Sequence, residues 1–405
     1  MASPLKLNLL IVYDRFEYGT DLPFSQQFNY KEIEAEGIAK ALRGKGHNVM
    51  LVDIDDLRWN KDHTALQDTF SGIREPFDPT QYDGVMWRCS TRPDRSNPLY
   101  AKHSDALHDI ASFIESKIPA FTPFKQLQAW DGKIHNQEQF EAHGIQAPMA
   151  VCVHKGETDV EEKITDFMDN CRKNGGLPFQ KFVVKKDCSA GTAKMKKYKI
   201  NGLFGGVSLG LTEEKALQKA KAWLQSKDGD LGNGIVVQQQ LPKHYERERI
   251  TMAVTPDHVQ IIDAMHPSRL KEEDYTLMQK LAKALGPGIW GIDALINEGR
   301  LAPKNRIHIL EVNPFSADTA IGHCEDPASF YLAEDIQEGA EAFVETICHA
   351  KGIDCPYIDT DRTIPFQKHT RTSEYGKPPT RQPETTVREV VAPEQQQVAG
   401  NGLNL

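Results

Sequence analysis

The chain has 405 residues, 39% of them hydrophobic and 26% charged, which suits two or three folded domains or one large α/β domain. Its 48 basic and 57 acidic residues give a formal net charge of −9, which argues against a general nucleic-acid binder. No apolar run reaches the roughly 18 residues of a membrane helix. The seven cysteines include no Cys-x-x-Cys pair. We therefore expect a cytoplasmic protein with reduced cysteines and without membrane or nucleic-acid partners.

Strands and helices alternate in the first 122 residues. Apolar runs predict strands at 7–14, 48–55 and 81–89, and a short strand at 118–123. Helical spacing of apolar residues predicts helices at 30–46 and 103–116. This alternation predicts a parallel sheet that is covered by helices on both faces.

The rest of the chain is predicted to mix helices with strands up to about residue 350. Helices are expected at 124–144, 213–227, 274–286 and 331–350, and the segment 155–177 is interpreted as polar chain without an assigned element. Strands are expected at 179–186, 233–241, 289–297 and 306–314, with a hairpin over 250–267. From about residue 359 the chain has five prolines, a Gln run and little aliphatic content, so this tail is predicted to be disordered.

Three oxygen-bearing side chains on the two last predicted strands form a candidate metal site. Asp293 lies between apolar neighbours on one strand, and Glu311 and Asn313 lie two residues apart on the next. A spacing of two places both side chains on one face of a strand. Carboxylate and amide oxygens suit Mg²⁺, which often bridges to phosphates. The alternative is a solvated sheet face without a metal.

Two lysines are candidates for phosphate binding. Lys185 ends the apolar strand FVVKK and enters a loop of small residues, in which Ser189, Ala190, Gly191 and Thr192 would let backbone N–H groups approach a phosphate. The loop lacks the GxxxxGK[ST] pattern of a Walker motif, and an ordinary hairpin turn is the alternative. Lys133, in AWDGKIHNQ, has the appearance of a surface lysine when taken alone.

The end of the strand at 233–241 is a candidate adenine site. Backbone groups at a strand end, with one polar side chain beside them, are suited to adenine, and Gln238, Gln239 and Leu241 match this arrangement. Glu246 and Glu248, slightly further along, are candidates for the ribose hydroxyls. A core strand with a polar end, followed by an exposed charge run, is the alternative interpretation.

The order of these features resembles the ATP-grasp superfamily, and within it the D-alanine–D-alanine ligase-like branch. The resemblance rests on AEGIAKALRGKGHNVMLVDID, on DGK followed by FEAHGIQAP, and on FVVKK combined with WGIDALIN and ILEVNP, and it covers about residues 7–350. It implies an α/β chain with the ATP-grasp fold and an N-terminal Rossmann-like domain. The implied division is 1–122 for that domain, 123–241 for the central subdomain, 242–358 for the catalytic subdomain and 359–405 for the tail.

The resemblance also implies roles for the candidate residues. ATP phosphates would lie at Lys133 and Lys185 beneath the loop that contains Ser189–Thr192, adenine along Gln238, Gln239 and Leu241, ribose at Glu248 or Glu246, and Mg²⁺ at Asp293, Glu311 and Asn313. Members of this superfamily transfer the γ-phosphoryl group of ATP to a carboxylate, and an amine then attacks the acylphosphate. A small-molecule kinase on the same scaffold and a non-catalytic nucleotide-binding protein are the alternatives.

The substrate side departs from the dipeptide ligases. Gly291 occupies the position of their arginine, so Arg269 and Lys271 are candidates to supply the missing positive charge. Arg88 is a candidate for a substrate carboxylate, and Asn313 and Ser316 lie where the substrate motif has changed. Ordinary surface charges and a structural salt bridge are the respective alternatives for these basic residues. We expect small-molecule carboxylate and amine substrates other than D-alanine, and we leave a homodimer open.

Overall fold

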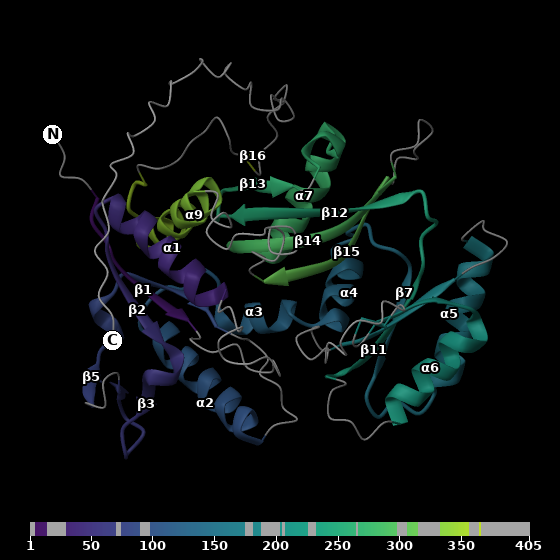
Figure 1. Cartoon of the computed structure of the whole chain (residues 1–405), viewed down its shortest axis with the longest axis horizontal. Helices are drawn as coiled ribbons and strands as arrows, with labels where there is room; N and C mark the ends of the chain where they lie inside the picture. The colour runs from purple at the N-terminus through teal and green to yellow at the C-terminus, as the bar shows by residue number, and fades with distance from the viewer. Residues whose placement is uncertain are drawn as a thin grey trace, which may run out of the picture.

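The computed structural model describes twelve stretches of the chain, and the account below concerns these stretches alone. They are 5–13, 30–69, 74–89, 98–174, 181–187, 203–204, 207–225, 232–264, 266–297, 306–314, 333–355 and 364–365. Within these ranges, no helix combines the length and the apolar character needed to cross a membrane. Figure 1 shows an elongated arrangement, with α1 and α9 toward one end and α5 and α6 at the other.

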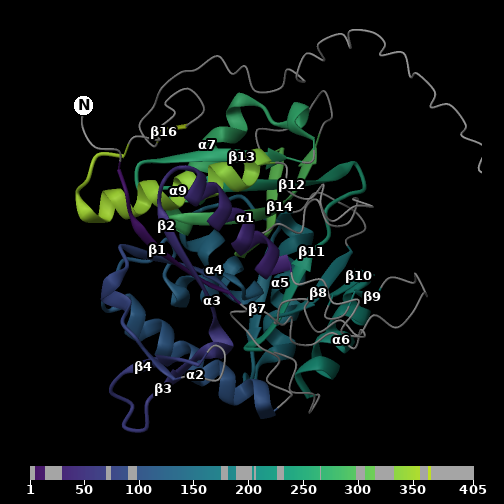
Figure 2. The same ribbon diagram turned by 60° about the vertical axis from the view of Figure 1, so that its left-hand side comes forward.

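The N-terminal unit is built on a parallel sheet. Its strands run in the order β2-β1-β6, with Leu10 opposite both Met50 and Val85. The elements are β1 (Asn8–Tyr13), α1 (Tyr30–Gly44), β2 (Asn48–Asp53), β6 (Gly84–Arg88) and α2 (Pro98–Glu115). A small antiparallel sheet of β3 (Leu57–Trp59), β4 (Leu66–Asp68) and β5 (Glu75–Phe77) lies beside α2 (Figure 2). The alternation predicted for the first 122 residues is confirmed, except that 118–123 makes only an isolated bridge, Val85 to Ala120.

Two helices follow where one helical stretch was predicted. They are α3 (Phe124–Trp130) and α4 (Lys133–Ala142), and the break falls at Asp131 and Gly132. The break matters because it makes Lys133 the first residue of a helix. Backbone N–H groups at a helix start have no partner within the helix and attract negative charge.

The middle lobe has a five-stranded antiparallel sheet and a hydrophobic core of its own. The strand order is β7-β11-β8-β10-β9, and α5 and α6 cover one face. Its elements are β7 (Ala150–His154), α5 (Val160–Asn174), β8 (Phe182–Lys186), β9 (Leu203–Phe204), β10 (Val207–Leu211), α6 (Glu213–Gln225) and β11 (Gly234–Gln239). Helix α5 lies within 155–177, where no element was assigned. Its buried Ile164, Phe167, Met168 and Cys171 have helical spacing that the many charged residues around them obscured.

The C-terminal lobe has a second five-stranded sheet, in the order β15-β14-β12-β13-β16. Its elements are β12 (Tyr245–Val254), β13 (His258–Ala264), α7 (Glu272–Leu285), β14 (Gly288–Asn297), β15 (Ile307–Pro314), α9 (Ala333–Lys351) and β16 (Ile364–Pro365). Helix α7 covers one face, where Met278 and Leu281 share a core with Trp290 and Ile292. Beyond β16, the predicted disordered tail lies outside the described residues.

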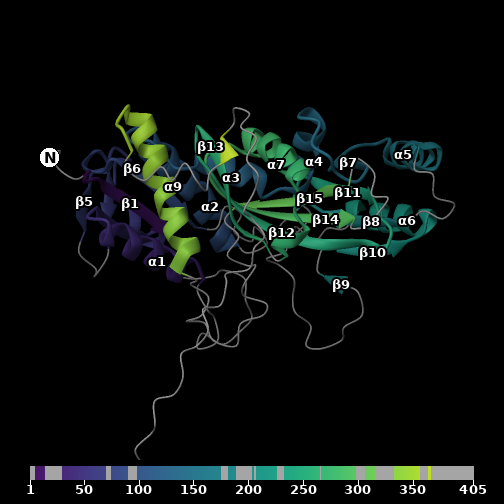
Figure 3. The same ribbon diagram turned by 90° about the horizontal axis from the view of Figure 1, so that it is seen from above.

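The C-terminal lobe and the N-terminal unit share their cores. One core joins Leu10 and Trp87 of the parallel sheet to Trp290 and Ile292 of β14, and a second joins β1, α1 and α9. Figure 3 shows α9 beside α1 at one end and the middle lobe at the other. The core of the middle lobe involves neither of these units, and among the described elements α4 packs both on β7 and β11 of this lobe and on α3 and β15.

Candidate active site

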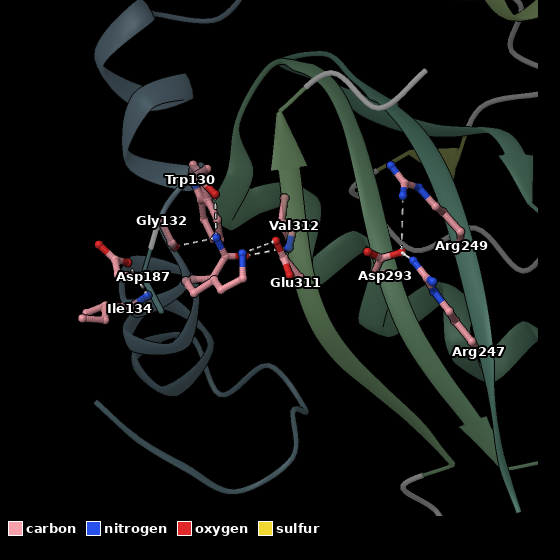
Figure 4. Close-up of polar contacts among 11 residues, drawn as sticks. Trp130, Gly132, Ile134, Asp187, Arg247, Arg249, Asp293, Glu311 and Val312 are labelled. Atoms are coloured by element: carbon pink, nitrogen blue, oxygen red, sulfur yellow. Dashed lines mark hydrogen bonds and ion pairs between the residues drawn. The ribbon is translucent and has the colours of Figure 1, made fainter. Parts of the chain in front are cut away.

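A lysine and a glutamate from two different lobes form the centre of the candidate site. Lys133 Nζ lies 2.9 Å from Glu311 Oε1, and only 7% of the lysine side chain is exposed (Figure 4). Lys133 begins α4, which packs against β7 and β11 of the middle lobe, whereas Glu311 belongs to β15 of the C-terminal lobe. The pair therefore marks the point where the two sheets approach each other.

A bulge in β15 sets the direction of Glu311. Asp293 is opposite Glu311, but the next residue, Ala294, is opposite Ile309, so Leu310 is an extra residue on β15. Bulges of this kind redirect side chains and are common beside active sites. The result places the Asp293 and Glu311 carboxylates side by side on one face, while Val312 and Ile309 enter the core on the other.

Lys185 brings a second positive charge to this cluster. It lies at the end of β8 on the face away from the middle-lobe core, and only 9% of it is exposed. Burial lowers the pKa of Lys185 to about 8; Lys133 adds to this effect, and the negative charges of Glu311 and Asp293 oppose it. Burial alone would raise the pKa of Glu311, but Lys133, Lys185 and Arg249 together outweigh it and lower that pKa. Two buried lysines beside two carboxylates form a site that can accept a phosphate together with a cation.

Two arginines that sequence reasoning missed also belong to this face. Arg247 Nη2 lies 3.1 Å from Asp293 Oδ1, and Arg249 Nη1 lies 3.8 Å from the same oxygen. Both come from β12, on which Arg249 is directly opposite Asp293. The available signal was the alternation in YERERITMAV, since residues 247 and 249 must share a face.

The glutamates of the same strand point the other way. Glu248 is completely buried, and its Oε1 accepts a hydrogen bond of 2.8 Å from the backbone N–H of His266. Arg269 lies 3.8 Å from Glu248 and 2.6 Å from Glu246. Lys271 lies at the start of α7, where its backbone N–H donates to Asp274. None of the described contacts brings Glu246, Glu248, Arg269 or Lys271 to the Lys133–Glu311 pair.

The start of α4 is fixed by Asp187, which follows Lys185 by two residues. The Asp187 carboxylate accepts hydrogen bonds of 2.9 Å from the backbone N–H groups of Ile134 and Asn233, and its carbonyl accepts one from Lys133. Asp187 is fully buried. The same short segment therefore carries Lys185 and holds the helix that presents Lys133.

The adenine candidates lie against the same helix. Gln238 is buried on β11, and its Nε2 lies 3.5 Å from Gln137 Oε1 of α4. The backbone N–H of Gln239 donates to Met149, and half-buried Leu241 follows the strand. This strand end and both lysines thus lie around α4.

Comparison with solved structures identifies the architecture. No protein-family model matches the chain, and no curated protein matches it. The macrocyclase MdnC bound with the precursor peptide MdnA, from Microcystis aeruginosa MRC, is similar at 16% identity with a TM-score of 0.50, over 82% of this chain and 99% of that chain. The chain has the ATP-grasp fold. The expected fold class is therefore confirmed.

Two further ATP-grasp structures match more weakly. The D-alanyl-alanine synthetase A from Vibrio cholerae O1 biovar eltor str. N16961 matches at 13% identity and a TM-score of 0.48, over 83% of this chain and 98% of that one. The RimK domain protein ATP-grasp from Sphaerobacter thermophilus DSM 20745 matches at 12% identity and a TM-score of 0.46, over 83% and 99%.

The oxygen donors of this cluster fit a magnesium ion that takes its remaining ligands from elsewhere. Within the described ranges, no group of three His, Cys, Asp or Glu residues could hold a metal alone. Asp293 and Glu311 are neighbours, and Asn313 shares their face of the sheet. Mg²⁺ usually takes one or two carboxylates and completes its shell with water and phosphate oxygens. This donor set is sufficient for such an ion.

The remaining candidates lie apart from the cluster or outside the described part of the chain. Arg88, at the end of β6, is buried and forms an ion pair with Glu34 of α1. This pairing agrees with the structural alternative and leaves the substrate role a prediction. Ser189, Ala190, Gly191, Thr192 and Ser316 lie outside the described residues.

Proposed function

We propose that this protein is an ATP-dependent carboxylate–amine ligase that forms an amide or peptide bond through an acylphosphate. One observation carries the proposal: Lys133 and Lys185 converge on Glu311 and Asp293 between the two sheets of an ATP-grasp fold. Positive charge from two lysines suits the phosphates of ATP, and the carboxylates suit the accompanying Mg²⁺.

In this proposal, the residues bind and orient ATP for phosphoryl transfer. Lys133 and Lys185 contact the phosphates through their ammonium groups. Asp293, Glu311 and Asn313 hold Mg²⁺, which offsets charge on the phosphates. Gln238, Gln239 and Leu241 border adenine.

The reaction then proceeds in two displacements. A carboxylate oxygen of the first substrate attacks the γ-phosphorus, the bond to the β-phosphate oxygen breaks, and ADP leaves. The amine of the second substrate attacks the acyl carbon, phosphate leaves, and the amine loses a proton to give the amide. Both displacements concentrate negative charge near the transferring group, which nearby cations stabilise.

Gly291 occupies the position at which the dipeptide ligases have an arginine. Arg249 is our candidate to supply that positive charge instead. Its guanidinium lies on the same face as Asp293 and Glu311 and is only 11% exposed. Arg269 instead contacts Glu246 and Glu248 on the opposite face. Gly291 is opposite Thr251, two residues from Arg249 along β12, so the charge would come from the neighbouring strand.

The proposed substrates are a small carboxylate, such as an amino acid other than D-alanine, and a small amine. A reducing, cytoplasmic compartment is part of the proposal. None of the five cysteines in the described part of the chain forms a disulfide.

A substrate screen read by ADP release and product mass tests this function. We expect ADP release to require ATP, Mg²⁺, a carboxylic acid and an amine together, with a product whose mass equals acid plus amine minus water. ADP release that needs only one hydroxyl-bearing substrate, with phosphate retained on the product, would contradict the proposal. The Glu311→Gln protein serves as the control for contaminating ATPase activity.

A further inference from the structure

One buried asparagine joins the helix that carries Lys133 to the strand that carries Glu311. Asn136 lies on the first turn of α4 and is only 2% exposed. Its Nδ2 donates hydrogen bonds of 2.6 Å to the Trp130 carbonyl and 2.8 Å to the Gly132 carbonyl, and its Oδ1 accepts one of 2.6 Å from the backbone N–H of Val312. The bonds to all three partners are drawn in Figure 4.

The hydrogen bond between Asn136 and Val312 lies directly beside the proposed metal ligands. Val312 lies between Glu311 and Asn313, the two residues of β15 proposed to hold Mg²⁺. Strand β15 is the edge of its sheet, so its outward N–H groups need partners from elsewhere. Asn136 supplies that partner at the residue between the two proposed ligands, and so fixes the backbone from which both side chains project.

The other two bonds fix the start of α4. Gly132 precedes Lys133 directly, and Trp130 ends α3. A side-chain amide offers two donors and an acceptor, and only one orientation of the amide meets two carbonyls and one N–H group. Aspartate would place a carboxylate against two carbonyl oxygens, and an aliphatic residue would leave all three backbone groups without this partner.

We propose that Asn136 is a positioning residue that sets the separation between the phosphate-binding lysine and the metal-binding strand. This inference rests on the proposed function for its consequence in nucleotide binding. Asn136 touches neither the nucleotide nor the metal; it acts through Lys133 and through the backbone of Glu311 and Asn313. Asp187 holds the same end of α4 to the middle lobe, so the two buried side chains fix Lys133 from both lobes.

The test is a double-mutant cycle between Asn136→Ala and Lys133→Ala. Binding of the β,γ-imido analogue of ATP with Mg²⁺ is measured by calorimetry on the full chain. We expect Asn136→Ala to weaken binding about tenfold, and to cause only about a threefold further loss in the Lys133→Ala background, where its hold on the metal-binding strand alone remains to be lost. A role in stability alone would give equal losses in both backgrounds and would overturn the inference.

Thr122→Val is the matched control. Thr122 is also buried, and its hydroxyl donates to the Pro287 carbonyl, joining the N-terminal unit to the C-terminal lobe away from Lys133. It should lower thermal stability as Asn136→Ala does, yet leave analogue binding unchanged. Should Asn136→Ala fail to fold, Asn136→Ser, which is uncharged and keeps a hydroxyl for one of these backbone groups, replaces it in the same cycle with the same expectation.

A crystal structure of the ligand-free Asn136 variant separates this inference from the proposed function. If the wild-type protein does not bind the analogue, the proposed function fails. The inference then stands only if the variant structure shows Lys133 Nζ displaced from Glu311 Oε1, which are 2.9 Å apart in the wild type. If the wild type binds and the variant binds equally well with that distance unchanged, the inference fails and the function stands.

Discussion

The two faces of β12, β14 and β15 carry similar charged residues but differ in what lies opposite them. On one face, Arg247 and Arg249 meet Asp293, and Lys133 of another lobe meets Glu311. On the other face, Glu248 meets Arg269 and the backbone of His266, both from the segment that leads into α7. The face with Asp293 and Glu311 meets a side chain from another lobe. The face with Glu248 is covered by residues of the C-terminal lobe itself.

This difference separates charges available for binding from charges used to hold the fold. A buried carboxylate that already accepts a backbone hydrogen bond has less capacity for a ligand. A lysine that pairs across two lobes can exchange its carboxylate for a phosphate, while the carboxylate turns to a metal ion. The comparison therefore predicts large functional effects on the first face and mainly structural effects on the second.

The largest expected effect comes from the proposed metal carboxylates. Asp293→Asn and Glu311→Gln should each lower the rate of ADP release about 10³-fold, because each removes charge that holds Mg²⁺ beside the phosphates. Circular dichroism and the melting temperature should stay close to those of the wild type. Glu341→Gln is the matched control, since Glu341 also pairs with a lysine, Lys45 at 2.6 Å, where α9 packs beside α1. Activity near the wild-type level in either site variant would remove the metal assignment.

Lys185 should separate binding from stability. Lys185→Met removes a charge whose burial is costly, so we expect the affinity for ATP with Mg²⁺ to fall about thirtyfold while the free energy of unfolding does not fall. Calorimetric binding and urea denaturation measure the two quantities. Unchanged affinity would place the phosphates elsewhere.

On the opposite face, Glu248→Gln should affect mainly stability. We expect a loss of about 1–3 kcal/mol in the free energy of unfolding, because the buried charge between His266 and Arg269 is removed. The KM for ATP should change less than about twofold, as measured by steady-state ADP release. If the variant raises the KM for ATP tenfold but leaves the KM for 2′-deoxy-ATP unchanged, the result would instead support the predicted contact between Glu248 and the ribose.

The smallest effect on activity is expected near the turn that joins β12 to β13, where α9 packs on both strands. Burial raises the pKa of Glu345 to about 7; a hydrogen bond with Thr255 opposes this shift, and the charge of Asp257 adds to it. His258 Nδ1 lies 3.1 Å from Glu345, and burial lowers the pKa of His258. Between about pH 4.5 and 7, Glu345 thus keeps its proton in the folded protein, whereas the same carboxyl in the unfolded chain has released it.

The protonated Glu345 side chain therefore contributes its full share of the unfolding free energy below about pH 4.5. This contribution is lost as the pH rises toward 7. His258 works in the opposite direction, because its contribution is lost as the pH falls below its ordinary value. Glu345→Gln should reduce the decline in unfolding free energy between pH 5 and 7.5 by about 2 kcal/mol, as measured by urea denaturation. Glu341→Gln on the same helix should leave the decline unchanged, and equal slopes in all three proteins would contradict the assignment.

Much of the fold was predictable because local patterns determine it. The alternation at 7–122 and the paired strands at 289–297 and 306–314 were confirmed, since period-two and helical patterns report burial directly. Helix α5 was missed because charged residues surround its four buried positions. The break before Lys133 was missed because it depends on Asp187, 54 positions along the chain, whose carboxylate accepts the hydrogen bond from Ile134 N–H at the start of α4.

The residue types of the candidate site were predictable from the sequence, but the face of the sheet on which each residue lies was not. Asp293 and Glu311 were found from their places on two neighbouring strands, Lys185 from a strand end, and Lys133 only through the family resemblance, and the structure brings the four together. Arg269 was the sequence candidate, whereas the arginine that lies beside Asp293 is Arg249, because the sequence alone did not show which face of β12 meets the second lobe. The bulge at Leu310, which aligns Glu311 with Asp293, depends on the register between β14 and β15 and has no local signature.

The fate of one oxygen atom tests the central claim most directly. Once the substrate acid has been identified, it is supplied with both carboxylate oxygens as oxygen-18, together with unlabelled ATP, Mg²⁺ and the amine. If an acylphosphate forms, one heavy oxygen moves from the acid to the released phosphate, and mass spectrometry of that phosphate shows the label in proportion to product. Phosphate that carries no label while product accumulates would contradict the ligase mechanism.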